Sequence, residues 1–382
     1  MNTARRKIQM KVKPLVSMAL SVMLLLGLNP AAAADLTAGM KTVKLELKSA
    51  GPVAFGPEGI LFVADPLAAT VHAVATGDTA AAKKKKVVSL EGVDRKIAAA
   101  LGTSPDKIRI SDLAVNPASG VAYLSVARGS GVAAPAVIVT VRGDHLESLD
   151  LSGLKSASFA LSSVPDAKAT TGRGRRRESA RTQAITDLGY VNGRVLVAGM
   201  SNEEFSSSLR SIPFPFAGSG KPASVEIYHG AHGRFETRSP VRTFVSLNVA
   251  GQPYLVAAYQ CTPLVTIPLS DIKPGARLKG KTVAELGNRN RPLDMIVYTK
   301  DGKEYMLIAN SSRGIMKVST VDLEKSPGIT ERVSGGGRKG VPYETIEGWK
   351  GILQLDRADD HNALVMRETE GGSFNLETLP LP

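Results

Sequence analysis

The sequence has 382 residues, 43% of them hydrophobic, and a formal net charge of +13 from 48 basic and 35 acidic residues. A single cysteine excludes an intramolecular disulfide, so a large hydrophobic core must stabilise the fold. The basic residues are spread along the chain. We therefore expect a protein or anionic ligand as the partner and no binding of nucleic acid.

The first 34 residues have the three zones of a secretory signal peptide. Five basic residues precede an apolar run over residues 15–28, shorter than the ~20 residues of a membrane-spanning helix. An alanine run then predicts cleavage after Ala33 or Ala34. The alternative is an uncleaved N-terminal anchor, but small residues stand where an anchor carries aromatic or charged ones. We expect a periplasmic or secreted protein with no transmembrane anchor after cleavage.

From residue 35 onward one pattern recurs about six times: an apolar run, a glycine-containing turn, and a second apolar run with alanine near its end. Turn pairs such as Asn192-Gly193 supply the positive φ that tight hairpins require, so each copy is predicted to be a β-hairpin. A third apolar run follows each hairpin, and often a fourth. The copies cover residues 53–65, 112–128, 187–199, 244–259, 294–310 and 344–356.

Four strands per unit predict an all-β fold, a six-bladed β-propeller of four-stranded antiparallel blades that forms a single domain over residues 35–382. The alanine-rich stretch 92–101 has Ile97 and Leu101 four residues apart, which indicates a short helix between the first two blades. Small residues near the ends of the second strands are expected at equivalent positions: Ala64, Ala127, Ala198, Ala257 and Ala309.

The stretch from Val53 to Val74, VAFGPEGILFVADPLAATVHAV, resembles the NHL repeat, and residues 294–318 resemble it more loosely. The chain is therefore similar to the six-bladed propeller superfamily of NHL-repeat, gluconolactonase and strictosidine-synthase-like proteins. The resemblance implies a fold and not a reaction. Lactonase members hold Ca²⁺ in the channel, but their opening acidic residue is replaced by Ala50 before Gly51-Pro52. We carry over no catalytic residue.

Carboxylates recur at one end of the predicted blades. Asp112, Asp187 and Asp294 occupy the same place in three units, and Asp65 follows a second strand. Since ring closure turns these ends toward one mouth, the four side chains are predicted metal ligands, with Ca²⁺ as the cofactor that oxygen ligands favour. The alternative is that each aspartate caps its own loop by accepting backbone N–H groups.

A second cluster combines arginine and asparagine from two loops of one predicted blade. Arg forks bind carboxylate or phosphate in a bidentate manner, so this cluster is a predicted anionic-ligand site. Surface arginines paired with neighbouring acids are the alternative. The residues are Arg289, Asn290, Arg291, Asn310 and Arg313.

His229 and His232 lie in a turn between two strands. Metal binding there would need both rings on one side and a further ligand, such as Glu226 or Glu236, and the spacing matches no established zinc pattern. Ordinary turn histidines are therefore the favoured interpretation. Cys261 follows a buried strand and is expected to behave as a small apolar residue, with an intermolecular or redox role as the alternative.

No nucleophile elbow, phosphate loop, haem cysteine pair or zinc cysteine cluster is present in the sequence. The favoured function is an exported propeller that binds a protein, peptide or anionic ligand on its loop face without catalysis. One alternative is a Ca²⁺-dependent hydrolase of the lactonase type. The other is a partner subunit of a periplasmic redox enzyme.

The predicted signal peptide generates the first test. Exported protein should begin at Ala34 or Asp35, because cleavage follows the small residues at the end of the alanine run. Intact-mass measurement and N-terminal sequencing of the exported material check this. Exported protein that begins at Met1 would contradict the prediction.

Overall fold

Five of the six predicted hairpins are present in the computed structural model, which describes residues 35–83, 85–171 and 178–382. The sixth, predicted over residues 344–356, is wrong: residues 344–345 pair with residues 316–317, and residues 352–357 form their hairpin with residues 362–368. Asn192 and Gly193 both have positive φ, at 49° and 75°, as a type I′ turn requires. The hairpin strands are β2 (Val53–Phe55) and β3 (Ile60–Asp65), β6 (Ile108–Val115) and β7 (Ala122–Arg128), β13 (Asp187–Val191) and β14 (Arg194–Met200), β18 (Val241–Val249) and β19 (Gln252–Tyr259), β22 (Pro292–Lys300) and β23 (Lys303–Asn310), and β27 (Ile352–Arg357) and β28 (Asn362–Glu368).

Further strands, many rich in valine and isoleucine, extend the hairpins into sheets. Within the described residues, one sheet has five strands, three have four, one has ten, and one pair stands apart. The added strands are β1 (Lys41–Thr42), β4 (Thr70–Ala75), β5 (Ser89–Leu90), β8 (Ala136–Arg142), β9 (His145–Ser148), β10 (Lys155–Ala160), β15 (Ser207–Pro213), β16 (Ala223–His229), β17 (Arg234–Glu236), β20 (Pro263–Pro268), β21 (Arg277–Leu286), β24 (Gly314–Ser319), β25 (Arg338–Gly340), β26 (Glu344–Thr345) and β29 (Phe374–Pro380), with the pair β11 (Thr170–Thr171) and β12 (Glu178–Ser179).

The predicted signal peptide, residues 1–34, lies outside the described residues, as does most of the basic stretch 172–181. Residues Leu36–Pro382 form one unit. In the part of the chain that the structure describes, no helix has both the length and the apolar character that crossing a membrane demands.

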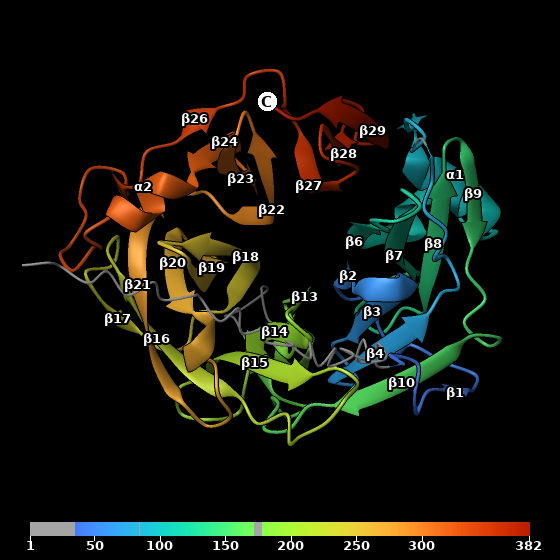
Figure 1. The fold of residues 1–382 in the computed structure, drawn as a ribbon, viewed down its shortest axis with the longest axis horizontal. Helices are drawn as coiled ribbons and strands as arrows, with labels where there is room; N and C mark the ends of the chain where they lie inside the picture. Colours follow the sequence, from blue (N-terminus) through green and yellow to red (C-terminus); the bar gives the residue numbers. More distant parts are fainter. Residues whose placement is uncertain (1–34, 84, 172–177) are drawn as a thin grey trace, which may run out of the picture. The chain divides into compact units, whose positions relative to one another are not determined.

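The six innermost strands of this unit contact one another in a closed series, β2, β6, β27, β22, β18 and β13, and then β2 again (Figure 1). The fold is therefore all-β and propeller-like, with few helices. Two expected units are fused, because β16 and β21 pair in parallel and join two four-stranded runs into the ten-stranded sheet. The count of six separate blades stays a prediction.

The order around the ring differs from the order along the chain. The segment after β4 leaves its own sheet and pairs β5 with β29, and the segment after β9 returns as β10 beside β4. The second unit along the chain consequently lies between the first and the last (Figure 1). Residues 86–92 were predicted as the fourth strand of the first unit, but β5 within them is the outer strand of the last sheet instead.

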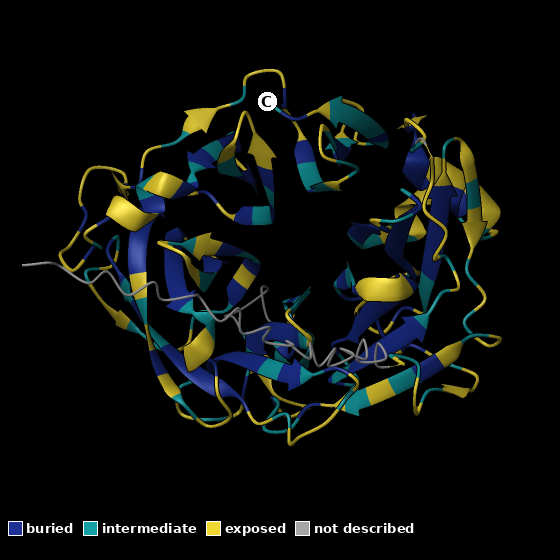
Figure 2. Cartoon of the chain, viewed as in Figure 1, coloured by how far each residue is buried: buried dark blue, intermediate teal, exposed yellow. Residues whose placement is uncertain are grey.

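The core lies between neighbouring sheets, where the strands are buried (Figure 2). The predicted short helix is confirmed as α1 (Val93–Ala100), and its Val93 and Ile97 pack between the sheet of β6 and the sheet of β28. A second helix, α2 (Thr320–Lys325), follows β24 and buries Leu323.

The predicted alanine positions are all buried but not all equivalent. Ala198 and Ala309 stand opposite Asp187 and Asp294 in the strand register, at the same place in their two sheets. Ala127 instead stands opposite Arg109, so the predicted equivalence fails there. A bulge between Ile110 and Asp112 contributes to this difference, since it shifts the register of β6 against β7.

The packing of β25 against β21 generates a test at Gly340. Its φ is +95°, and an added Cβ would lie 2.1 Å from the Val283 carbonyl oxygen. Gly340→Ala should therefore lower the free energy of unfolding by about 2 kcal/mol or more, measured by urea denaturation. Gly335→Ala is the matched control, because Gly335 has a similar φ of +71° with nothing within 4 Å of the added Cβ. Equal losses in the two variants would contradict the packing.

Candidate functional site

Asp65, a predicted calcium ligand, is buried at the end of β3 and is bonded to nearby loops. Its carboxylate accepts hydrogen bonds from the Lys48 N–H at 2.5 Å, the Ser49 hydroxyl at 2.8 Å and the Ala68 N–H at 3.1 Å. The two oxygens of Asp65 thus accept three hydrogen bonds from nearby loops. These contacts match the alternative to metal binding, in which the aspartate fixes a loop.

The other predicted calcium ligands lie on innermost strands, and each joins its own sheet to the next sheet in the ring. Asp356, which the sequence pattern did not indicate, does the same. We call these four side chains the aspartate clasps. They accept backbone N–H groups of the next sheet: Asp187 from Phe244 at 2.7 Å, Asp294 from Leu355 at 2.9 Å, Asp356 from Val115 at 2.7 Å, and Asp112 from Val53 at 2.8 Å.

The aspartate clasps surround the centre of the ring and repel one another. Burial raises the pKa of Asp112 to about 8, and the charge of Asp187 adds to the increase. Burial likewise raises the pKa of Asp187 to about 7 and that of Asp356 to about 6, against an ordinary value of 3.8. The pKa of Asp294 is also raised, by burial and by the charge of Asp112.

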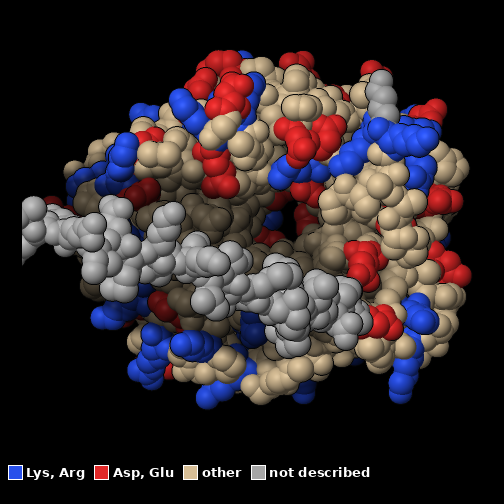
Figure 3. Space-filling model, viewed as in Figure 1, with Lys and Arg blue, Asp and Glu red and all other residues tan. Residues whose placement is uncertain are grey.

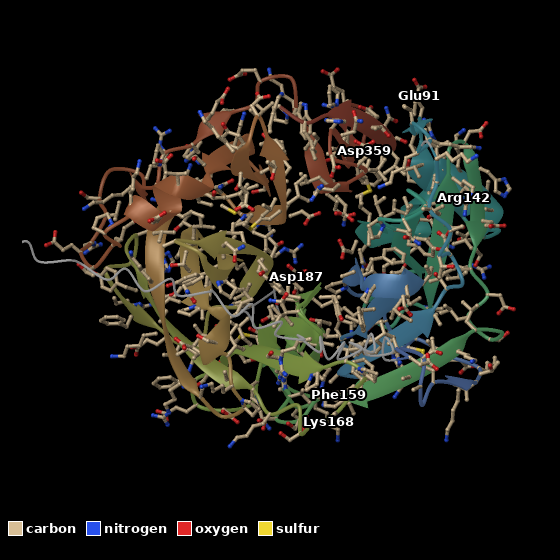
Figure 4. The ribbon with its side chains drawn as sticks, viewed as in Figure 1. Glu91, Arg142, Phe159, Lys168, Asp187 and Asp359 are labelled. Atoms are coloured by element: carbon tan, nitrogen blue, oxygen red, sulfur yellow. The ribbon has the colours of Figure 1, made fainter. Side chains whose placement is uncertain are left out.

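Asp187 lies at the inner end of its sheet, whereas Phe159 and Lys168 lie at the periphery (Figure 4). Figure 3 shows acidic groups beside the narrow central opening. The carboxylate oxygens of the predicted calcium ligands nevertheless do not form a metal cluster. Among the described residues, no three carboxylates come within 4.8 Å of one another. The calcium site at Asp65, Asp112, Asp187 and Asp294 stays a prediction, and the contacts give these residues a structural role.

The structure brings together the two loops of the predicted anion site. Asn290 and Asn310 are buried, and the Asn290 amide donates to Asn310 Oδ1 at 2.8 Å. The Ser312 hydroxyl donates to the Arg289 carbonyl at 2.7 Å, and Arg313 Nη2 donates to the Asn288 carbonyl at 3.2 Å.

The arginines of this predicted anion site differ in exposure. Arg289 and Arg291 are exposed, and Arg313 is half-buried. Within the described residues, none of the three forms an ion pair, and Arg313 Nε has no hydrogen-bond partner. The alternative of arginines neutralised by neighbouring acids is therefore not what these contacts show.

A further group, which we call the histidine–cysteine cluster, consists of His229, His232, Glu236 and Cys261. His229 ends β16, Glu236 ends β17, and Cys261 lies between β19 and β20. One ring nitrogen of each histidine and the Cys261 sulfur all lie within 4.8 Å of one another. Of all the residues that the structure describes, only these three side chains form such a group.

A single carboxylate orients both histidines. Glu236 Oε2 lies 3.0 Å from His229 Nδ1, and Glu236 Oε1 lies 2.6 Å from His232 Nδ1. The two rings are 3.8 Å apart between centroids. Glu236 takes both Nδ1 positions, and His229 Nε2 lies 3.2 Å from the Thr262 hydroxyl oxygen, a contact that a metal ion bound at this nitrogen would replace. Metal-binding histidines in proteins usually donate their other ring N–H to a carboxylate in this way.

Glu285, a fully buried carboxylate at the end of β21, closes the inner side of the cluster. It accepts the Thr262 hydroxyl and, at 2.6 Å, the Gly230 N–H, and it lies 3.9 Å from His229 Nε2. Position 230 is restricted to glycine, since an added Cβ would lie 2.8 Å from a Val333 methyl and 3.1 Å from Glu285.

The local field favours positive charge at His229. Burial alone would lower the pKa of His229, but hydrogen bonds with Cys261 and Glu236 and the charge of Glu285 raise it to about 9. Burial would raise the pKa of Glu236, but its bonds with His229, His232 and Ser239 hold it well below its usual range. In the metal-free protein these groups therefore favour the protonated form of His229 beside the ionised form of Glu236.

The sequence pointed to parts of this cluster without joining them. His229, His232 and Glu236 were recognised as a conceivable metal set, and ordinary turn histidines were favoured; Cys261 was expected to be a buried apolar residue but is exposed. No feature of the sequence indicated Glu285. The cluster draws on β16, β17 and the loop between β19 and β20, and the parallel pairing of β16 with β21 that brings it beside Glu285 has no local sequence signature.

No protein-family model and no curated protein sequence matches the chain. Among solved structures, it is similar to the PQQ-bound aldose sugar dehydrogenase of Streptomyces coelicolor, with 11% identity over 89% of this chain and 96% of that one, at a TM-score of 0.32. A glucose dehydrogenase gives 10% identity over 89% and 99%, at 0.34. A chain of the mitotic checkpoint complex gives 8% identity over 100% and 99%, at 0.34. Likeness at these TM-scores carries no argument about function.

The aspartate clasps predict a pH dependence of stability. Their folded pKa values exceed 3.8, so the stability they contribute is fully present below pH 3.8 and is lost as the pH rises through about 6 to 8. The melting temperature should therefore be several degrees higher at about pH 5.5 than at about pH 8.5. Asp112→Asn keeps an acceptor oxygen and removes the titration, so the difference should shrink. A difference that is unchanged in this variant would contradict the assignment.

Proposed function

We propose that this protein is an exported propeller that binds a divalent transition-metal ion of the zinc class through His229, His232 and Cys261. The observation that supports it is the gathering of one ring nitrogen of each histidine and the Cys261 sulfur within 4.8 Å of one another, with Glu236 beside the Nδ1 atoms of both histidines. Imidazole and thiolate ligands suit zinc, copper or nickel, whereas calcium prefers oxygen.

Three protein ligands with an open fourth position are the arrangement of catalytic zinc sites, while structural zinc sites have four protein ligands. The cluster has such an open side, because His232 and Cys261 are exposed while Glu285 and Thr262 close the inner side. A metal ion with one open position can polarise a bound oxygen or lower the pKa of bound water. Metal-assisted hydrolysis therefore fits better than binding without catalysis.

The proposal includes the architecture and the location of the protein. A count of six blades follows if the ten-stranded sheet is divided at β16 and β21, because each half then has four antiparallel strands. Membership of the NHL-like superfamily and export to the periplasm or the medium remain part of the proposal. Their support is the repeat pattern and the N-terminal sequence.

The redox alternative, a partner subunit of a periplasmic redox enzyme, rests on the expected compartment, and the sugar and glucose dehydrogenases among the similar structures only suggest a substrate with which to test it. The metal site and the redox alternative differ in an observable result. Dye-linked oxidation of glucose after addition of PQQ and Ca²⁺ would favour the redox alternative and count against the metal proposal.

The metal site is tested by titration with Zn²⁺ and Co²⁺. Binding at 100 times Kd should stabilise the folded state by about 2.7 kcal/mol, seen as a rise in melting temperature. Co²⁺ should give a thiolate-to-cobalt charge-transfer band. Cys261→Ser should remove this band, and Glu236→Gln should weaken binding by about 10-fold to 100-fold, because it loosens the orientation of both rings.

His145→Ala is the matched control, because His145 is exposed and lies 3.7 Å from Glu147 in a sheet that contributes nothing to the cluster. It should bind both metals as the wild type does. A cobalt spectrum without the thiolate band, or zinc stabilisation that persists in both His232→Ala and Cys261→Ser, would overturn the proposal.

A further inference from the structure

The exposed side of the histidine–cysteine cluster is bordered by arginine side chains. Arg234 Nε lies 3.4 Å from Glu236 Oε1, so this guanidinium stands beside the carboxylate that orients both histidines. Arg332 packs over the histidine turn, since a Cβ at Gly233 would lie 2.9 Å from Arg332 Cγ. Arg332 is exposed and forms no ion pair within the described chain.

The predicted anion site borders the same turn. A Cβ at Gly337 would lie 2.5 Å from Asn288 Oδ1 and 3.5 Å from the Ala231 methyl, so Asn288 and the histidine turn are separated by one glycine. The Asn288 carbonyl accepts the Arg313 guanidinium at 3.2 Å. Two sites that are far apart in the sequence therefore share one surface.

The arginines have unused donor capacity. Arg313 Nε lacks a hydrogen-bond partner, and its guanidinium lies over Gly287, where an added Cβ would be 2.7 Å from it. A planar fork with free N–H groups matches the two oxygens of a carboxylate or phosphate. An anion gains charge pairing as well as hydrogen bonds from such groups, a neutral sugar gains hydrogen bonds alone, and a cation is repelled.

We infer that the ligand at the open position is a small anion with a carboxylate or phosphate group, bound by the metal ion on one side and by Arg332 and Arg313 on the other. This inference rests on the proposed metal site. The metal ion would bind one oxygen, and the guanidinium groups would hold the remaining oxygens and set the orientation. The substrate class is thus a compound that carries a free carboxylate group or a phosphate ester, rather than a neutral lactone.

The test uses the full mature protein loaded with Co²⁺, with inorganic phosphate and acetate as probes. Either anion should shift the visible cobalt spectrum in a saturable manner. In Arg332→Ala/Arg313→Ala, at least one of the two anions should bind more than 10-fold more weakly, while Co²⁺ itself binds as in the wild type. Arg128→Ala is the control, since Arg128 is exposed at the end of a different sheet.

Each outcome has one meaning. A cobalt thiolate band that neither anion perturbs leaves the metal site standing and overturns the anion site. Anion shifts that are identical in the wild type and the double arginine variant overturn the role of the arginines. The absence of a thiolate band in the anion-free protein overturns the metal site itself, and the inference that rests on it fails with it.

Discussion

Closure of a ring of sheets leaves the inner edge of each innermost strand without a neighbouring strand, and its N–H groups need other partners. The aspartate clasps meet this need at four junctions: β13 with β18, β22 with β27, β27 with β6, and β6 with β2. Each carboxylate crosses to the next sheet, so it fixes one innermost strand against the next. The burial of these carboxylates, and secondly the repulsion between them, opposes this bonding.

The need of edge strands for hydrogen-bond partners also applies to the outer edges, where two segments leave their own sheets. The strand β10 covers the outer edge of β4, and β5 covers the outer edge of β29, so these outer edges are each paired with a strand distant in sequence. Side-chain bonds secure β5, since Asn375 Oδ1 accepts the Gly92 N–H at 3.0 Å and the Thr378 hydroxyl accepts the Val88 N–H at 2.9 Å. These exchanges join the first, second and last units through backbone hydrogen bonds.

The features that were predictable are local ones. The pair Asn192-Gly193 defines its own turn, and the spacing of Ile97 and Leu101 marks α1, because the backbone and near neighbours decide both. Features that depend on contacts between distant parts of the chain have no such local sequence pattern. Asp356 was missed because Arg357 follows it, whereas Asp112, Asp187 and Asp294 precede an apolar residue. The order of the sheets was equally invisible, since nothing in residues 86–92 indicates which edge they will join.

The histidine–cysteine cluster depends on the one place where the fold departs from separate sheets. The parallel pairing of β16 with β21 places Ile227 beside Gly280, where an added Cβ would lie 3.3 Å from an Ile227 methyl. That pairing carries His229 and Glu285, at the ends of the two strands, to within 3.9 Å of each other. Two separate sheets would pack through side chains and hold these ends farther apart. The irregularity that obscures the blade count is therefore also what assembles the site.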